Sequence, residues 1–144
     1  MNPLSFASCT VSSLGELVRD ALSQLGMSEE MLMEFDHHST VVLGFEHISD
    51  IMISVLNDRL WVWSVLNGVG DGIVLQNAVG VLPVLMEPMD NIETSQLTLG
   101  KSEEGYELKA LVSLQCLSSS DGMALGRIVE DFYKRLEYLH KIIS

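Results

Sequence analysis

Positive charge and cysteine are both scarce in this 144-residue sequence. Eight Lys and Arg residues stand against 20 Asp and Glu residues, which gives a formal net charge of −12. Contacts to nucleic-acid phosphates need clustered Lys and Arg, so the composition argues against a nucleic-acid partner and suits a basic partner or simply solubility. Cys9 and Cys116 have no CxxC or metal-ligand spacing. They could pair, but two free thiols in a cytosolic protein are the simpler interpretation.

Long apolar runs are also missing. The longest stretch without a polar side chain is Ala78–Met86, and Gly80 and Pro83 interrupt it, whereas a membrane-spanning helix needs about 20 apolar residues. No basic residue precedes Arg19, so we expect no secretory signal. The length predicts one domain over residues 1–144, with residues 1–11 as a flexible lead-in.

Apolar residues nevertheless make up 47% of the chain, and the mean hydropathy of +0.27 is high for such an acidic sequence. We therefore expect apolar surface that a second subunit or a partner covers. Residues 121–144 hold four acids and four bases, so the whole net charge of −12 lies in residues 1–120.

Helical spacing of apolar residues from Leu14 to Leu25 predicts a first helix over Ser13–Leu25. Ser13 and Glu16 form a capping-box pattern at its start, and Gly26 stands where a glycine commonly ends a helix. Met27–Asp36 is acidic and rich in methionine, and we expect one short helical turn there.

Three strands are predicted next, over residues 39–45, 51–56 and 60–66, from alternating apolar residues. Asn57–Arg59 has the composition of a tight turn between antiparallel strands. The third strand has apolar residues on both faces, so we expect both faces to be covered. One face carries Trp61, Trp63 and Val65, and the other carries Leu60, Val62 and Leu66.

A second helix is predicted from Asp71, as its N-cap, to about Glu87. Its apolar residues go almost all the way round, which is typical of a helix buried on every side, and Pro83 should kink or shorten it. In so small a domain this pattern predicts a homodimer interface. The interface residues that we predict are Val74, Leu75, Val79, Leu82 and Leu85, with the neighbouring strand at 96–100 as a further candidate.

The last third of the chain predicts strands at 96–100 and 106–114, then a long helix capped by the serine run at 118–120 with Asp121. This helix has acid-first i,i+4 pairs, such as Glu130–Lys134 and Asp131–Arg135. The predicted order is α-β-β-β-α-β-β-α, an α+β fold with a mainly antiparallel sheet.

Residue types that could carry chemistry gather at Asp36, His37 and His38, with Glu46 and His47 nearby. Adjacent histidines point in different directions in an extended chain, and no motif with metal-ligand or nucleophile spacing supports them. We expect no catalytic residue, no metal and no cofactor. The glycines at 68, 70 and 72 lie between a strand and a helix, but they complete no phosphate-binding motif, and a flexible turn is the favoured interpretation.

Two further features have open interpretations. Eight methionines could line an adaptable binding surface or simply fill the core. Trp61 and Trp63 fit a core or dimer interface better than a stacking platform for bases, which would also need positive charge.

Several short motifs resemble the InvB/SpaK group of class IB type III secretion chaperones. They occur in one order and at near-constant spacing, and the similarity extends over Leu14–Leu139. The motifs are His38–Leu43, Ile53–Val55, Trp61–Trp63, Val74–Gln76, Gln96–Gly100 and Leu108–Val112. The sequence departs from the group in a longer N-terminus and in Pro83.

The resemblance implies a small acidic homodimer in the bacterial cytoplasm that is not an enzyme. Such a chaperone binds the N-terminal segment of several secreted effectors, keeps it extended and soluble, and delivers it to the secretion ATPase. Candidate effector contacts are Leu17 and Leu25 on the first helix and Phe45 and Val62 on the sheet, although each could equally be core.

Two alternatives from other functional classes stay open. One is a small hydrolase or metal-dependent enzyme that uses Asp36, His37 and His38. The other is a scaffold dimer without a client.

Overall fold

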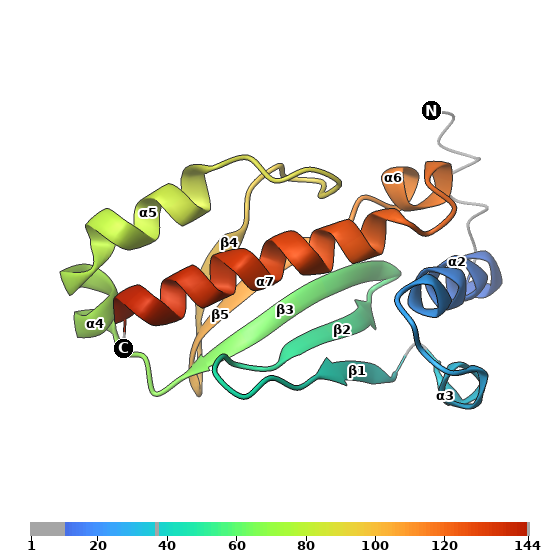
Figure 1. Cartoon of the computed structure of the whole chain (residues 1–144), viewed down its shortest axis with the longest axis horizontal. Helices are drawn as coiled ribbons and strands as arrows, with labels where there is room; N and C mark the ends of the chain where they lie inside the picture. The colour runs from blue at the N-terminus through green and yellow to red at the C-terminus, as the bar shows by residue number, and fades with distance from the viewer. Residues whose placement is uncertain (1–10, 37, 144) are drawn as a thin grey trace.

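The computed structural model describes residues 11–36 and 38–143. Its five strands form one antiparallel sheet in the order β1-β2-β3-β5-β4. The C-terminal helix α7 lies across one face of this sheet, as Figure 1 shows. The predicted α+β fold class and the predicted antiparallel sheet are confirmed. Apart from Val11, the lead-in expected at residues 1–11 lies outside the described residues.

Helix α2 spans Val11–Gln24, and the short helix α3 spans Glu29–Glu34. Gly26 ends α2 with a φ of +106°. The amides of Gly26 and Met27 donate to carbonyls of the last helical turn at 3.0 and 3.1 Å, which is the Schellman arrangement. The prediction for Gly26 is confirmed. The capping box predicted at Ser13 is wrong, because the helix already includes the residues before it.

Strands β1 (Thr40–Leu43), β2 (Ile51–Leu56) and β3 (Arg59–Asn67) form an antiparallel meander. Asn57 and Asp58 join β2 to β3 with φ values of 53° and 59°. Two consecutive positive φ values are typical of the type I′ turn, whose twist matches that of the strands it joins. The tight turn is therefore confirmed.

The two faces of β3 differ in burial. The face beneath α7 holds Leu60, Val62 and Leu66, all buried, and Ser64, which is buried but donates to the carbonyl of Asp50 at 2.8 Å. The opposite, outer face carries the two tryptophans and Val65, which stay partly exposed. The expectation that both faces are covered is therefore wrong within this chain.

The single helix predicted over 71–87 is wrong, because the structure has two helices there. Helix α4 spans Asp71–Gln76 and α5 spans Ala78–Met86. They are separated by Asn77, whose side-chain amide donates to the carbonyl of Ile73 at 2.8 Å. An asparagine bonded back to its own helix offers the backbone an alternative to continued helix. Pro83 lies inside α5 without ending it.

One further expectation for this region is corrected. Gly70 is the N-cap of α4, and Asp71 is instead its first residue. Within this chain only Val81 and Val84 of α5 are buried and no residue of α4 is, so burial of the other apolar residues against a second subunit stays a prediction.

Strands β4 (Thr98–Ser102) and β5 (Gly105–Leu111) form a hairpin whose turn is Glu103–Glu104. The strand predicted to reach Leu114 ends earlier, because a short helix, α6 (Leu114–Ser119), begins there. The side chain of Ser113 caps α6 by accepting from the amide of Cys116 at 3.2 Å. The predicted strand overlaps this helix only at Leu114, and the rest of the helix has no counterpart in the predicted elements.

Helix α7 spans Ala124–Ile143. Ser120, from the predicted serine run, accepts from the amide of Ala124 at 3.0 Å. The ion pairs Glu130–Lys134 and Asp131–Arg135 are confirmed at 3.3 and 2.9 Å. Its apolar stripe forms the centre of the core. The fully buried members are Leu125, Ile128, Phe132, Leu136 and Leu139. Among the helices of residues 11–36 and 38–143, none is long and apolar enough to cross a membrane.

Candidate functional site

The predicted effector contacts lie on the helix side of the sheet, with different exposure. Leu17 of α2 and Leu25, the residue that follows α2, are partly buried and pack against the core. Phe45 follows β1, is 37% exposed, and its ring centroid lies 5.0 Å from that of Tyr133 on α7. Val62 has no exposed surface. Three of the four residues therefore offer a partner some apolar surface, whereas Val62 belongs to the core of this chain.

Strands β1 and β4 are the two edges of the sheet. Each pairs through one side only within the described part of the chain, so each leaves a row of backbone N–H and C=O groups available. An edge of this kind can accept an extended peptide as an additional strand. Phe45 lies just beyond β1, so an apolar side chain stands next to one such edge.

The residues predicted for a dimer interface form an exposed apolar surface on α4 and α5. Leu75 is 73% exposed, Val79 is 90% exposed and Leu82 is more than half exposed, as is Met86, which was not among the predicted residues. Val74 and Leu85 are partly buried. In Figure 1 these two helices project at one end of the molecule, beyond the sheet. Exposing this much apolar surface on two short helices to water is unfavourable, and such surfaces commonly mark interaction sites.

The residues proposed for enzyme chemistry make local turn contacts. The carboxylate of Asp36 accepts from the amide of His38 at 2.8 Å and from the hydroxyl of Ser39 at 3.1 Å. His37 lies outside the described residues. His47 and Glu46 are 3.9 Å apart, and both side chains are almost fully exposed. Within the part of the chain that the structure describes, no group of three His, Cys, Asp or Glu could hold a metal ion.

Asp71 links the glycine-containing turn at 68–72 to the β4–β5 hairpin. Its carboxylate accepts from the ammonium of Lys101 at 2.7 Å and from the hydroxyl of Tyr106 at 2.5 Å. The hydrogen bond from Lys101, followed by that from Tyr106, lowers the pKa of Asp71. The same contact with Asp71 raises the pKa of Lys101. This carboxylate would repel a phosphate, so the turn serves to position the hairpin.

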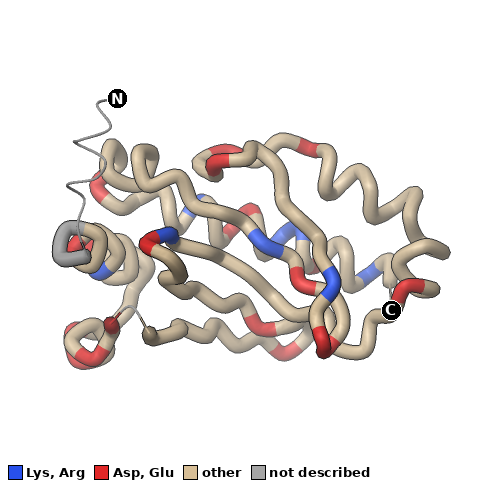
Figure 2. Tube along the Cα trace, turned by 180° about the vertical axis from the view of Figure 1, so that it is seen from behind, with Lys and Arg blue, Asp and Glu red and all other residues tan. Residues whose placement is uncertain are grey.

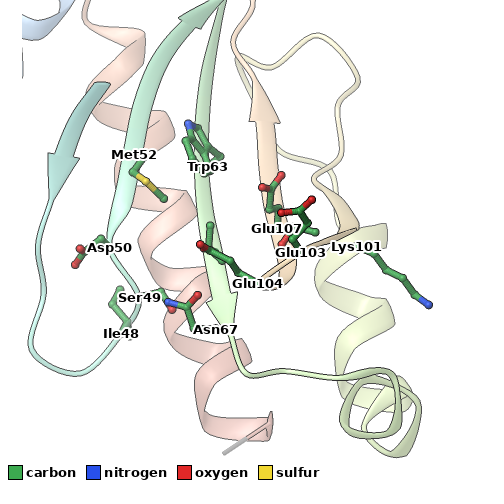
Figure 3. A pocket seen from close by; sticks show the side chains of 12 residues that line it. Ile48, Ser49, Asp50, Met52, Trp63, Asn67, Lys101, Glu103, Glu104 and Glu107 are labelled. Atoms are coloured by element: carbon green, nitrogen blue, oxygen red, sulfur yellow. The ribbon is translucent and has the colours of Figure 1, made fainter. Parts of the chain in front are cut away.

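The outer face of the sheet holds a polar and aromatic cavity that the sequence did not predict. It has a volume of about 900 Å³, and residues from the start of β2, from β3 and from the β4–β5 hairpin line it. Figure 3 shows Met52 and Trp63 at one end and the side chains of three glutamates beside them. The glutamates are Glu103, Glu104 and Glu107.

Comparison with known proteins places the chain in a family. The model of the invasion protein B family matches residues 26–103. The chain belongs to this family. It is 35% identical over 124 residues to the surface presentation of antigens protein SpaK of Salmonella typhimurium, which covers 86% of this chain and 90% of that protein. The SpaK protein of Salmonella typhi matches to the same extent.

Membership in the invasion protein B family confirms the resemblance to InvB/SpaK-type secretion chaperones. The chain is thus a type III secretion-associated protein of the chaperone type, a class connected with virulence. The family match begins at residue 26, so Leu17 of α2 and Leu25 just after this helix lie before the matched segment.

Proposed function

We propose that the protein is a cytoplasmic type III secretion chaperone that binds the N-terminal segments of several effectors as a homodimer. It keeps each segment extended and soluble, delivers it to the secretion ATPase, and is not an enzyme. Membership in the invasion protein B family carries this proposal.

The helix side of the molecule supports the binding role. Leu17, Leu25 and Phe45 offer partly exposed apolar surface, and β1 offers an unpaired strand edge beside Phe45. Backbone hydrogen bonds along such an edge would give affinity, and apolar contacts would select the side chains of the segment. Ordering a disordered segment costs about 2–5 kcal/mol of the gross interaction energy, so the contact must be long and largely apolar.

The homodimer would form through α4 and α5. Their exposed residues Leu75 and Val79 would be covered by the same surface of a second copy, as a two-fold axis requires. The enzyme alternative has no support of this kind, because the carboxylate of Asp36 accepts from the backbone amide of His38 and the hydroxyl of Ser39 within its own turn.

The binding role can be tested by co-expressing the full chain with the N-terminal segment of an effector of the same secretion system. Phe45→Glu would add a charge to the proposed contact. We expect this variant to remain a folded dimer and to lose most of the bound segment. Leu56→Glu is the matched control, since Leu56 is also exposed but lies at the β2–β3 turn, and it should retain the segment. If both variants retain the segment equally, Phe45 is not an effector contact. If Phe45→Glu unfolds, Phe45 is a core residue.

Salt tests whether apolar burial or charge dominates binding. At about 0.5 M salt the screening length falls to a few Å, which weakens exposed ion pairs but not apolar burial. We expect the effector segment to remain bound in large part. Complete release would show that the negative charge of residues 1–120 does most of the binding.

A further inference from the structure

The outer face of the sheet already holds one cation against a tryptophan. The ammonium of Lys109 lies 5.7 Å from the ring centroid of Trp61 and 3.1 Å from the carboxylate of Glu107. A cation over an indole ring is attracted by the negative face of its π-system. An aromatic ring, a carboxylate and a positive charge therefore already lie together on this face of the sheet.

Trp63 stands next to this arrangement and faces the cavity of about 900 Å³. Its indole N–H donates to the hydroxyl of Ser54 at 3.0 Å, which fixes the orientation of the ring. Met52 is paired with Trp63 across β2 and β3, so a thioether and an indole form the apolar end of the cavity. No cation lies over Trp63 within the described residues.

The hairpin side of the cavity wall is acidic, and of its three glutamates only Glu107 has an ion-pair partner, Lys109, within the described residues. Glu103 and Glu104 form no ion pair within the described part of the chain. Lys101, the one basic residue of the wall, is paired with Asp71 at 2.7 Å, and Figure 3 shows its side chain directed away from the glutamates. Figure 2, seen from the outer side of the sheet, shows acidic positions gathered at these strand ends.

A polar atom of the wall also lacks a partner. The hydroxyl oxygen of Ser102 is buried and has no hydrogen bond within the described residues. A buried hydroxyl without a partner costs free energy unless a ligand or water satisfies it. The cavity thus has one aromatic surface and two carboxylates without an ion pair in the described part of the chain, those of Glu103 and Glu104, and both features favour a cationic hydrogen-bond donor.

We propose that this cavity binds an arginine side chain, next to an apolar residue, from an extended segment of a partner protein. The guanidinium would stack on Trp63 and donate to Glu103 or Glu104, while the neighbouring apolar side chain would contact Met52. Arginine fits better than lysine, because its planar group can stack on a ring and pair with carboxylates at once. A second copy of this chain is the less suitable occupant, since it carries the same net charge of −12.

This inference does not depend on the proposed function. The effector contacts proposed above lie on the helix side of the sheet, whereas the cavity lies on the outer face.

The test uses the full-length protein and a blocked pentapeptide, acetyl-Ala-Arg-Leu-Arg-Ala-amide. The readout is the NMR signal of the Trp63 indole N–H, assigned with Trp63→Phe and compared with that of Trp61. We expect saturable movement of the Trp63 signal, larger than that of Trp61. The same peptide with both arginines replaced by citrulline, which has nearly the same shape but no charge, should not move it.

A matched pair of charge variants separates the cavity from the general acidity of the chain. Glu103→Gln with Glu104→Gln should weaken the arginine peptide about tenfold, as loss of a charged contact predicts. Glu29→Gln with Glu30→Gln removes the same charge from α3 and should change the affinity less than about twofold, as expected for screened distant charges. Both pairs are on exposed segments, and the spread of amide signals verifies that each variant is folded.

Three results would overturn the proposal. Equal weakening by both charge variants would mean that only net charge attracts the peptide. Equal binding of the citrulline peptide would mean that the guanidinium charge is not recognised. Movement of the Trp63 signal with protein concentration alone would assign the outer face to a second copy of the chain.

Discussion

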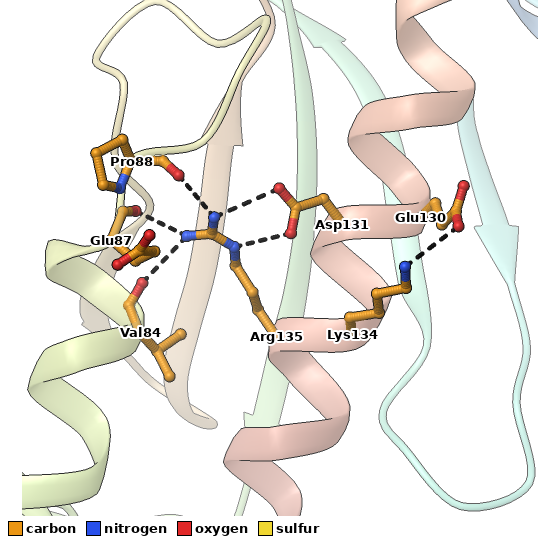
Figure 4. A network of polar contacts seen from close by, with 7 residues as sticks. All are labelled: Val84, Glu87, Pro88, Glu130, Asp131, Lys134 and Arg135. Atoms are coloured by element: carbon orange, nitrogen blue, oxygen red, sulfur yellow. Dashed lines mark hydrogen bonds and ion pairs between the residues drawn. The ribbon is translucent and has the colours of Figure 1, made fainter.

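Arg135 of α7 donates a hydrogen bond of 2.8 Å to the backbone carbonyl of Glu87, the residue that caps the C-terminus of α5. The same guanidinium donates to the carbonyls of Val84 and Pro88 and is paired with Asp131. Figure 4 shows these contacts converging on one side chain. Carbonyls at a helix C-terminus have no partner within the helix and carry partial negative charge. Arg135 therefore anchors α5, the helix proposed for dimer formation, to α7.

Replacing Arg135 by Met should destabilise the protein by about 2 kcal/mol, because charged hydrogen bonds contribute about 1.5–3 kcal/mol each and some are replaced by water. Only 14% of the side chain is exposed, so solvent screening is limited. The free energy of unfolding in urea measures the effect, and hydrogen exchange should accelerate in α5. The control is Lys134→Met, which removes an exposed ion pair and should cost about 0.5 kcal/mol or less. Equal effects of the two substitutions would contradict the anchoring role.

Local patterns in the sequence predicted most of the fold, because the signals for these elements lie within a few residues. Alternating apolar residues gave β2 with the bounds that the structure has, and Asn57 and Asp58 carried the signature of their turn. The break at Asn77 was missed because apolar residues continue on both sides of it. Helix α6 was missed because its apolar residues directly follow a strand, and Ser113 was not interpreted as a cap.

The outer-face cavity could not be predicted in this way, because its residues come together only through strand pairing. Met52 and Glu104 are far apart in the sequence and meet because β2 pairs with β3 and β3 with β5. The sequence did contain the relevant signals, namely two tryptophans on one face and the acidic pair at 103–104. The place where a second copy would meet α5 likewise depends on contacts between two chains, which local patterns within one chain do not specify.

Gly122→Ala should destabilise the protein strongly. Gly122 has a φ of +85°, and a Cβ there would lie 2.9 Å from the Cα of Ala21 in α2. The strained backbone costs about 1–3 kcal/mol, and the backbone contact cannot yield as a flexible side chain would. We expect a loss of about 3 kcal/mol in the free energy of unfolding. The control is Gly72→Ala in α4, where a Cβ would meet nothing within 4 Å and alanine should be neutral or stabilising by up to about 1 kcal/mol.

Stability should decrease as the pH falls below about 6.5, the usual pKa of histidine. The imidazole of His140 accepts from the amide of Ser49 at 3.1 Å, which requires an unprotonated nitrogen. Burial lowers the pKa of His140, so between the folded and the unfolded pKa the unfolded chain binds the proton more readily. By linkage the free energy of unfolding then falls with decreasing pH and levels off below the folded pKa.

The measurement is urea unfolding between pH 5 and pH 8. His140→Gln should reduce the dependence of the free energy of unfolding on pH. His47→Gln changes an almost fully exposed side chain and should leave this dependence unchanged. A profile that is identical in wild type and His140→Gln would exclude this histidine as the source.

Val79→Glu should convert the proposed homodimer into a folded monomer. Val79 is 90% exposed on α5, so a glutamate there disturbs no core contact of the single chain. In a two-fold interface the two substituted residues lie near the axis or face the same apolar surface, and the buried charges would be left unpaired. Removing both from water costs several kcal/mol, which is enough to shift dissociation from the nanomolar to the micromolar range or beyond.

Light scattering at micromolar concentration measures the mass, and circular dichroism verifies that the helices remain. Met33→Glu is the control, because Met33 is similarly exposed but lies on α3, and this variant should keep the mass of the wild type. A wild-type chain that is already a monomer of 15.9 kDa at this concentration would remove the dimer from the proposed function. If the Val79→Glu variant is still a dimer, the interface does not include this part of α5.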